Sequence, residues 1–212
     1  MALDPSLFLR GLVIGLAIAA PVGPIGLLCI RRSLSGGFAS GFFTGLGAAA
    51  ADGVYGAVAA FGLTAVASFL AQQQGWLRLG GGAALVALGI SLALKPPPAP
   101  RDAARAGETF AGLAAAFGQT FLLTLANPAT VLSFLAIFAG LGLGGTVTSA
   151  WGAGLVVAGV FLGSAAWWLF LAGVSARLGH AIAPATIKWI NRASGAGVAG
   201  FGLAAVASFF LV

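Results

Sequence analysis

The chain has 212 residues, of which 60% are hydrophobic and 7% are charged, and its mean hydropathy is +1.07. Because soluble proteins carry about 25% charged residues, this composition excludes an ordinary soluble domain and predicts that most of the surface faces lipid. The net charge of +6 does not indicate nucleic-acid binding, because the basic residues lie at the edges of apolar runs instead of forming one face with interleaved aromatic residues.

Long uncharged intervals predict six membrane-spanning helices, since a bilayer core of about 30 Å is crossed by about 20 apolar residues. The alternating polar and apolar pattern of a membrane β-barrel is absent. The expected spans are Leu7–Ile30, Phe38–Leu70, Trp76–Leu94, Thr109–Leu143, Ala150–Ala176 and Trp189–Leu211. We therefore predict an all-α polytopic membrane protein, with residues 1–212 forming a single transmembrane domain.

The first predicted span carries its own interruption, APVGP at positions 20–24. Prolines remove amide donors and free the carbonyls that those amides would have bonded. Unpaired backbone groups are costly in lipid, so a broken helix is tolerated only inside protein or beside a watery cavity. Pro21, Gly23 and Pro24 are therefore candidate binding positions, and an ordinary proline kink is the structural alternative.

The second predicted span contains Asp52, the only formal charge in the middle of an apolar stretch. An aspartate at the bilayer centre costs about 2.5 to 3.5 kcal/mol, so it needs a partner, a cavity or a proton. Burial favours the protonated form of a carboxyl group, which suits proton exchange. We expect Asp52 to hold a substrate ammonium, a cation or a coupled proton; a hydrogen-bonded acid that only ties helices together is the alternative.

Residues 95–108, KPPPAPRDAARAGE, form the only strongly polar linker and divide the chain into two halves, 1–94 and 109–212. A shift of 113 positions overlays a tryptophan and two glycines of the halves: Trp76 on Trp189, Gly82 on Gly195 and Gly89 on Gly202. Three spans per half would make the repeats inverted, a recurring transporter plan with the site at the repeat interface. Chance similarity in a Gly/Ala-rich chain is the alternative.

The fourth predicted span is interrupted at Asn127-Pro128, in TLANPATVLSF. Asn127 can bond to freed backbone groups or to a polar ligand, and one break in the first span of each half suits a site at a two-fold interface. Gln119 and Thr124 precede the break. They either extend its polar lining or form hydrogen bonds between helices.

Aromatic residues and glycines within the spans are less specific. Tyr55, Trp167 and Trp168 are candidates for lining a solute path, with lipid-facing positions as the alternative. Glycines separated by three residues predict close helix contacts: Gly11/Gly15, Gly41/Gly45 and Gly159/Gly163.

Eight of the ten Lys and Arg residues follow the first, third and fifth spans. Only Arg10 and Arg78 lie on the opposite side. Because basic loops stay in the cytoplasm, residues 95–108 are expected to be cytoplasmic and both termini to face outward.

These motifs together resemble the LysE/RhtB family of amino-acid exporters. The resemblance covers the whole length: APVGPIG, the spaced glycines after the basic pair, the acid beside a glycine in the second span, and the Asn-Pro of the fourth span. It implies a LysE-like fold in the cytoplasmic (inner) membrane of a bacterium. It also implies that the functional positions are Pro21, Gly23, Pro24, Asp52, Asn127 and Pro128.

The chain departs from the family pattern at two points. Members often carry a lysine where this chain has Ala129, and a Pro-Gln-Phe where it has residues 140–143. These departures affect the expected substrate more than the expected fold.

The sequence therefore predicts a secondary transporter that exports an amino acid or a similar small polar solute, coupled to protons, by alternating access. A divalent-cation exporter of the same superfamily is the alternative. It is disfavoured because Asp52 is the one acid within the spans and His180 lies in a loop. No Ser–His or Cys–His pair and no HExxH motif falls within the spans, so neither an enzyme nor a resident metal or cofactor is expected. Expected partners are the solute, protons and lipid, and a homodimer is left open.

Overall fold

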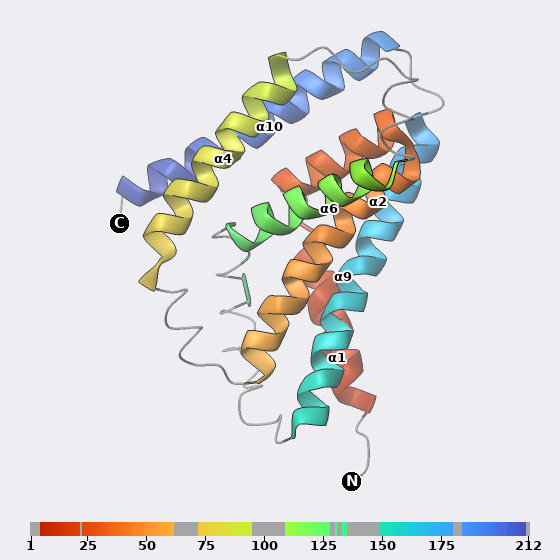
Figure 1. Ribbon diagram of the computed structural model, residues 1–212, viewed down its shortest axis with the longest axis vertical. Coiled ribbons are helices and arrows are strands. Elements are labelled where there is room, and N and C mark those ends of the chain that lie inside the picture. Colours follow the sequence, from red (N-terminus) through yellow and green to blue (C-terminus); the bar gives the residue numbers. More distant parts are fainter. Residues whose placement is uncertain are drawn as a thin grey trace.

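The computed structural model describes residues 5–21, 23–61, 72–94, 109–127, 130, 133–134, 149–179 and 184–210. Its principal elements are all helices (Figure 1): α1 Pro5–Ala19, α2 Pro24–Ala60, α4 Gln74–Leu94, α6 Phe110–Leu125, α9 Ala150–Gly179 and α10 Pro184–Phe210. The predicted all-α class is confirmed for this part of the chain.

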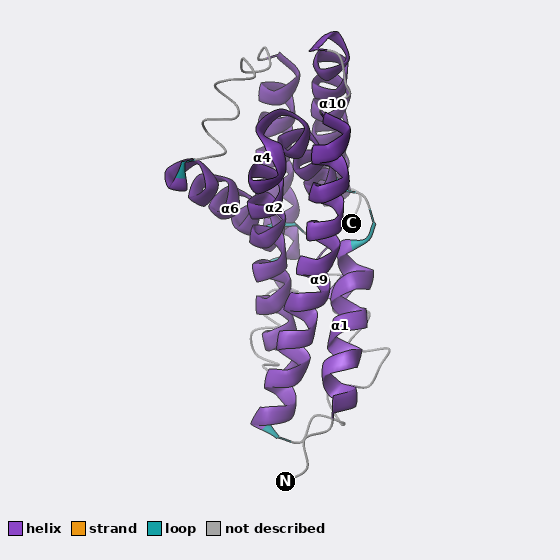
Figure 2. Cartoon of the chain, turned by 90° about the vertical axis from the view of Figure 1, so that its right-hand side faces the viewer, coloured by secondary structure: helices purple, strands orange, loops and turns teal. Residues whose placement is uncertain are grey.

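The helices form two groups. α9 packs along both α1 and α2, and α4 lies antiparallel to α10. α6 crosses α2 obliquely, and its Phe110 end projects sideways from the bundle (Figures 1 and 2). α10 also contacts α2, so the α4–α10 pair closes one side of the space into which the first helix break and the end of α6 open.

The first predicted break is confirmed. α1 ends at Ala19, and α2 begins at Pro24 with its axis turned by 81° from that of α1. Pro24 occupies the first helical position, where its missing amide costs no helical hydrogen bond. Gly23 before it is extended, with φ −110° and ψ −163°. The helical ladder is therefore interrupted between Ala19 and Pro24.

The second predicted break begins where expected. α6 ends at Leu125, and the Asn127 amide bonds to the Thr124 carbonyl at 3.1 Å, which turns the chain. The Thr130 amide in turn bonds to the Asn127 carbonyl at 3.1 Å. Pro128 lies outside the described residues.

The predicted basic turn between the first two spans has a different form. The chain stays helical through Arg31 and Arg32, and α2 is interrupted at Gly37 alone, with φ 78° and ψ 179°. Glycine tolerates this positive φ at little cost. The two parts of α2 fold back so tightly that a Cβ on Gly41 would overlap the side chain of Ser33. The second part of α2 therefore begins at Phe38, the residue at which the second span was predicted to begin.

Six spans are confirmed only in part. In the described ranges, two helices are long and apolar enough to cross a membrane, Ala150–Leu178 and Arg192–Phe210, and α1 with α2 forms a bent third candidate. Arg78–Ser91 and Phe110–Leu125 are shorter apolar helices. The linker 95–108 and the ends of the second and fourth predicted spans fall outside the described residues.

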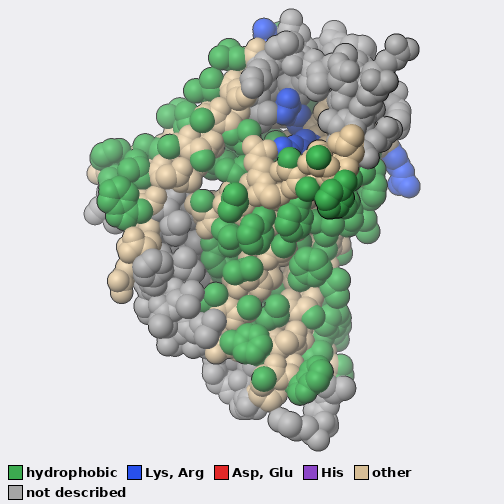
Figure 3. All heavy atoms as spheres, viewed as in Figure 1, with side chains coloured by type: hydrophobic (Ala, Val, Ile, Leu, Met, Phe, Trp, Pro, Cys, Tyr) green, Lys and Arg blue, Asp and Glu red, His purple; other side chains and the backbone are tan. Residues whose placement is uncertain are grey.

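Exposed aromatic side chains stand at the beginnings of four helices, Phe110, Trp76, Trp151 and Trp189, each more than two-thirds exposed. Aromatic rings of this kind are enriched where a bilayer meets water. On the face seen in Figure 3, apolar side chains cover the middle, and the Lys and Arg side chains gather toward one end. The surface is therefore that of a membrane protein, while the orientation of its termini stays a prediction.

The predicted close contacts of spaced glycines are confirmed between α1 and α9. A Cβ on Gly11 or Gly15 would overlap the backbone of α9, and a Cβ on Gly159 or Gly163 would overlap the backbone of α1. The two backbones can meet only because all four positions lack a side chain. In lipid, such packing supplies much of the association energy between helices.

Gly159→Ala is therefore expected to destabilise the protein, by roughly 1 to 3 kcal/mol for an overpacked contact. Gly154→Ala on the same helix meets open space and is the matched control; alanine's better helix propensity should leave it neutral or slightly more stable. Thermal unfolding in detergent measures both. Equal melting temperatures for the two variants would contradict the packing described here.

Candidate functional site

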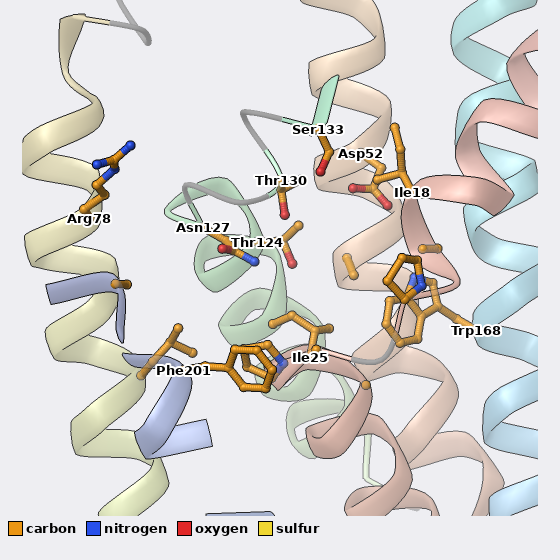
Figure 4. Close-up of a pocket in the computed structure, with 18 of the residues that line it drawn as sticks. Ile18, Ile25, Asp52, Arg78, Thr124, Asn127, Thr130, Ser133, Trp168 and Phe201 are labelled. Atoms are coloured by element: carbon orange, nitrogen blue, oxygen red, sulfur yellow. The ribbon is translucent and has the colours of Figure 1, made fainter. Parts of the chain in front are cut away.

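A cavity of about 560 Å³ lies where the two helix breaks meet α4, α9 and α10. Its wall combines the first break, α2 and α4 from the first half with the end of α6, α9 and α10 from the second half. Its polar and charged side chains are Asp52, Arg78, Thr124, Asn127, Thr130, Ser133 and Ser208 (Figure 4). A mostly apolar hollow with a few convergent polar groups is the usual form of a small-solute site.

The structure brings seven of the eleven candidate residues from the sequence to this one cavity: Pro21, Gly23, Pro24, Asp52, Thr124, Asn127 and Trp168. They come from four separate segments of the chain, so the two breaks and the buried acid share a single space. The orphaned backbone groups of a broken helix therefore have a cavity beside them, as the physics of a lipid environment requires.

Asp52 is held at the cavity wall by a chain of hydrogen bonds. The Ser164 hydroxyl on α9 donates to its Oδ2 at 2.7 Å, and the Trp168 indole N–H donates to the Ser164 Oγ at 3.1 Å. Gly45 allows this arrangement, because a Cβ there would overlap the Trp168 side chain. Asp52 is only 3% exposed, and no side chain that the structure describes forms an ion pair with it. A buried carboxyl group without an ion-pair partner is stable when it is protonated or when a cation binds beside it.

Thr124 provides an unusual hydroxyl. Its side chain is 3% exposed and lines the cavity, yet its Oγ1 has no hydrogen-bond partner among the described residues. A buried polar atom left unsatisfied costs about 1 to 3 kcal/mol and calls for an explanation. A polar group of a bound solute would satisfy this hydroxyl.

Tyr55 lies behind the cavity. Its hydroxyl donates to the Leu125 carbonyl at 2.5 Å, and its ring packs against Phe134 with the centroids 5.4 Å apart. Leu125 is the last residue of α6, where carbonyls lack an intrahelical amide. Tyr55 therefore supports the α6 end that carries Asn127, and it is absent from the cavity wall.

The other two predicted positions also lie away from the cavity wall. Trp167 packs its ring on Phe170, with the centroids 5.7 Å apart. Gln119 accepts a hydrogen bond from Arg32, which also donates to the Thr44 hydroxyl at 3.0 Å and to the Ala116 carbonyl at 3.2 Å. Gln119 thus takes part in hydrogen bonding between helices, the second of the two expectations for it. Pro128 lies outside the described residues.

Sequence reasoning underrated three residues of this region. Arg78 entered only as a basic residue of the outward side, although its position inside the predicted third span was a signal. Ser164, a hydroxyl in the middle of the predicted fifth span, was passed over. Trp168 was grouped with its neighbour Trp167, and the sequence alone did not distinguish which of the two faces inward.

In the part of the chain that the structure describes, no group of three or more His, Cys, Asp or Glu side chains is placed to hold a metal ion. The polar groups at the cavity are instead a carboxylate, an arginine, hydroxyls and an amide. These are groups that bind the charged and hydrogen-bonding parts of a small organic solute.

Comparison with known proteins agrees with this picture. A family model for LysE type translocator proteins matches residues 16–208. The chain is 34% identical over 135 residues to the Bacillus subtilis (strain 168) protein named "Putative amino acid efflux protein YcgF", a match that covers 63% of this chain and 62% of that relative. No solved structure matches. Because the family model covers both helix breaks, Asp52 and α10, the chain belongs to the LysE type translocator family, whose members are multi-pass membrane proteins.

Proposed function

We propose that this protein exports an amino acid, or a similar small polar solute, across the cytoplasmic membrane of a bacterium. The observation that carries the proposal is the cavity between two helix breaks, with a buried carboxylate that no described cation neutralises. Membership of a translocator family and a relative named for amino acid efflux support it. An amino acid offers an ammonium for the carboxylate and further polar groups for the hydroxyls and the amide.

Asp52 would couple transport to protons by binding its two cationic partners in alternation. A buried carboxylate is stable when it is protonated or when it faces an ammonium, and costly when it has neither. A solute that leaves Asp52 must then be replaced by a proton, and a proton must leave before the next solute binds. This exclusive occupancy is the minimum requirement for proton-coupled exchange.

The contacts between α4 and α10 support inverted repeats. Gly82 lies against Gly202, and Gly89 lies against Gly195. The 113-residue shift relates Gly82 to Gly195 and Gly89 to Gly202, so each contact becomes the other when the halves are exchanged. The glycines that the repeat aligns therefore lie at the contact between the two helices, as a two-fold relation between the halves requires.

A second pair of contacts repeats the pattern. Gly47 on α2 packs against the carbonyl of Phe117 on α6, and Gly159 on α9 packs against the carbonyl of Phe8 on α1. Each glycine also meets the amide four residues further along that neighbour. α2 thus relates to α6 as α9 relates to α1, as expected when each half pairs its first helix with the second helix of the other half.

Aligning Gly47 with Gly159 is a shift of 112 positions, one fewer than the shift of 113 for α4 and α10, and it places Asp52 opposite Ser164, the residue that donates to it. The only buried acid that the structure describes would then lie at the pseudo-two-fold axis, where one half moves least when it rocks against the other. A central site of this type, opened alternately to either side, is the alternating-access scheme of inverted-repeat transporters.

The direct test loads purified wild-type protein into liposomes with a panel of radiolabelled amino acids and follows their efflux under an imposed proton gradient. Efflux of one or more amino acids, faster with the gradient than without it, is the expected result. A divalent cation panel runs in parallel. Movement of a divalent cation with no movement of any amino acid would overturn the proposal in favour of the cation-exporter alternative.

Asp52→Asn is expected to reduce gradient-driven efflux to the level of empty liposomes, because an amide holds neither a proton nor an ammonium. The amide can still accept the Ser164 hydrogen bond, so thermal unfolding should change little. Full gradient-driven efflux by the folded variant would remove the acid from the mechanism.

Thr124→Val separates a binding role from a packing role, since valine keeps the branched shape and removes the hydroxyl. Loss of an unsatisfied buried polar atom should leave stability unchanged or raise it by about 1 kcal/mol. Efflux should nevertheless fall by about tenfold, the equivalent of one lost hydrogen bond to the solute.

Thr120→Val, one turn earlier on α6, is the matched control for Thr124→Val. Thr120 is equally buried, but its hydroxyl already bonds to the Ala116 carbonyl at 3.0 Å and does not line the cavity. Its efflux should match that of the wild type. Equal efflux from both variants would show that the Thr124 hydroxyl does not touch the solute.

A further inference from the structure

We propose that Arg78 forms an anion subsite in the cavity and binds the carboxylate of the exported solute. The inference rests on the proposed function, in that it takes the solute to be an amino acid or a close analogue. It assigns the carboxylate to a residue on α4, in the third helix of the first half, away from both helix breaks and from Asp52.

The position of Arg78 carries the argument. It lines the cavity beside Phe201, Ala205 and Ser208 of α10, and Figure 4 shows it on α4, on the opposite side of the view from Asp52. Asp52 is the one acidic residue that the structure describes, and no described residue forms an ion pair with Arg78. The cavity therefore has a cationic end and an anionic end.

One hydrogen bond holds the arginine head at this wall. Its Nη1 donates to the Ser208 carbonyl at 3.2 Å. Ser208 lies in the last turn of α10, where carbonyls have no intrahelical amide. A neutral amide could make the same contact, and a guanidinium has five N–H donors in a rigid fork. Capping α10 thus uses one donor and does not require the positive charge.

Arg78 lies near the beginning of α4, where a cation gains nothing from the helix dipole. Trp76, two residues earlier, is 69% exposed at the helix end, whereas Arg78 is half-buried and turned toward α10. A side chain that only needed water could extend to the surface. A half-buried arginine that faces a cavity is instead suited to an anion.

A carboxylate is the anion that fits a zwitterionic solute. Arginine binds carboxylates through two parallel N–H···O bonds, which fix orientation as well as charge. An amino acid would place its carboxylate at Arg78 and turn its ammonium toward Asp52. Ile25, Leu85 and Phe201 in the same wall would then receive an apolar side chain.

The test compares leucine with leucinamide, which keeps the ammonium and side chain but lacks the carboxylate. If the panel selects another amino acid, that amino acid and its amide replace this pair. Wild-type protein, Arg78→Gln and Arg78→Lys are each placed in liposomes, and the half-saturating concentration is measured for both solutes. In Arg78→Gln that concentration should rise about tenfold or more for leucine and stay unchanged for leucinamide. Arg78→Lys, which keeps the charge without the fork, should fall between.

Three outcomes overturn the proposal. An equal rise in the half-saturating concentration for leucine and leucinamide in Arg78→Gln would mean that Arg78 only caps α10. An unchanged half-saturating concentration for leucine would mean that Arg78 does not bind the carboxylate. Wild-type efflux of leucinamide without efflux of any amino acid would leave an amine exporter with no carboxylate site. Failure of the wild type to move either class of solute would instead overturn the proposed function itself. If Arg78→Gln does not fold, as judged by thermal unfolding, Arg78→Lys replaces it. Its half-saturating concentrations for leucine and leucinamide are then compared with those of the wild type in the same way.

Discussion

The backbone of this protein is organised by one constraint: a peptide group in lipid must find a hydrogen-bond partner within the protein or in enclosed water. Two segments violate the helical ladder, at Pro21–Pro24 and at Asn127, and both open onto the same cavity. Local features satisfy some of the backbone groups at the breaks. The Tyr55 hydroxyl donates a hydrogen bond to the Leu125 carbonyl, and Pro24 is the first residue of its helix, where an amide would have no helical partner. The polar cavity and the broken helices are therefore parts of one solution.

Rows of glycines at two helix contacts, called glycine seams here, allow the helices around the cavity to pack closely. Where Gly159 meets α1 and where Gly89 meets Gly195, the two backbones touch with no side chain between them. Such seams hold helices rigidly along their length while they leave the space between the groups unfilled. The α1–α9 seam and the α4–α10 seam each lie within one of the two helix groups that line the cavity, so the rocking movement proposed above requires no helix to unfold.

The sequence was sufficient to find residues that do not suit an apolar, uninterrupted membrane helix. It was not sufficient to find residues whose role depends on how the helices pack. Pro21, Asp52 and Asn127 are each wrong for an uninterrupted lipid-facing helix, so each could be recognised from its neighbours alone. The direction in which a side chain points depends on helix rotation and crossing, which sequence does not fix. That is why Tyr55 was a candidate for the solute path although its hydroxyl bonds to the end of α6, and why Arg78 was counted only among the basic residues of the outward side.

The fold of α2 shows the same limit at the level of the backbone. The start of the second span at Phe38 was predictable, because a basic pair and two glycines end an apolar run. The helical path through Arg32 was not, because it depends on tertiary partners: Arg32 bonds to Thr44, across the fold at Gly37, and to the Ala116 carbonyl of the other half. A charged residue expected in a water-exposed turn instead joins two helices. Charge alone therefore marks the end of a span less reliably than a glycine that the backbone geometry requires.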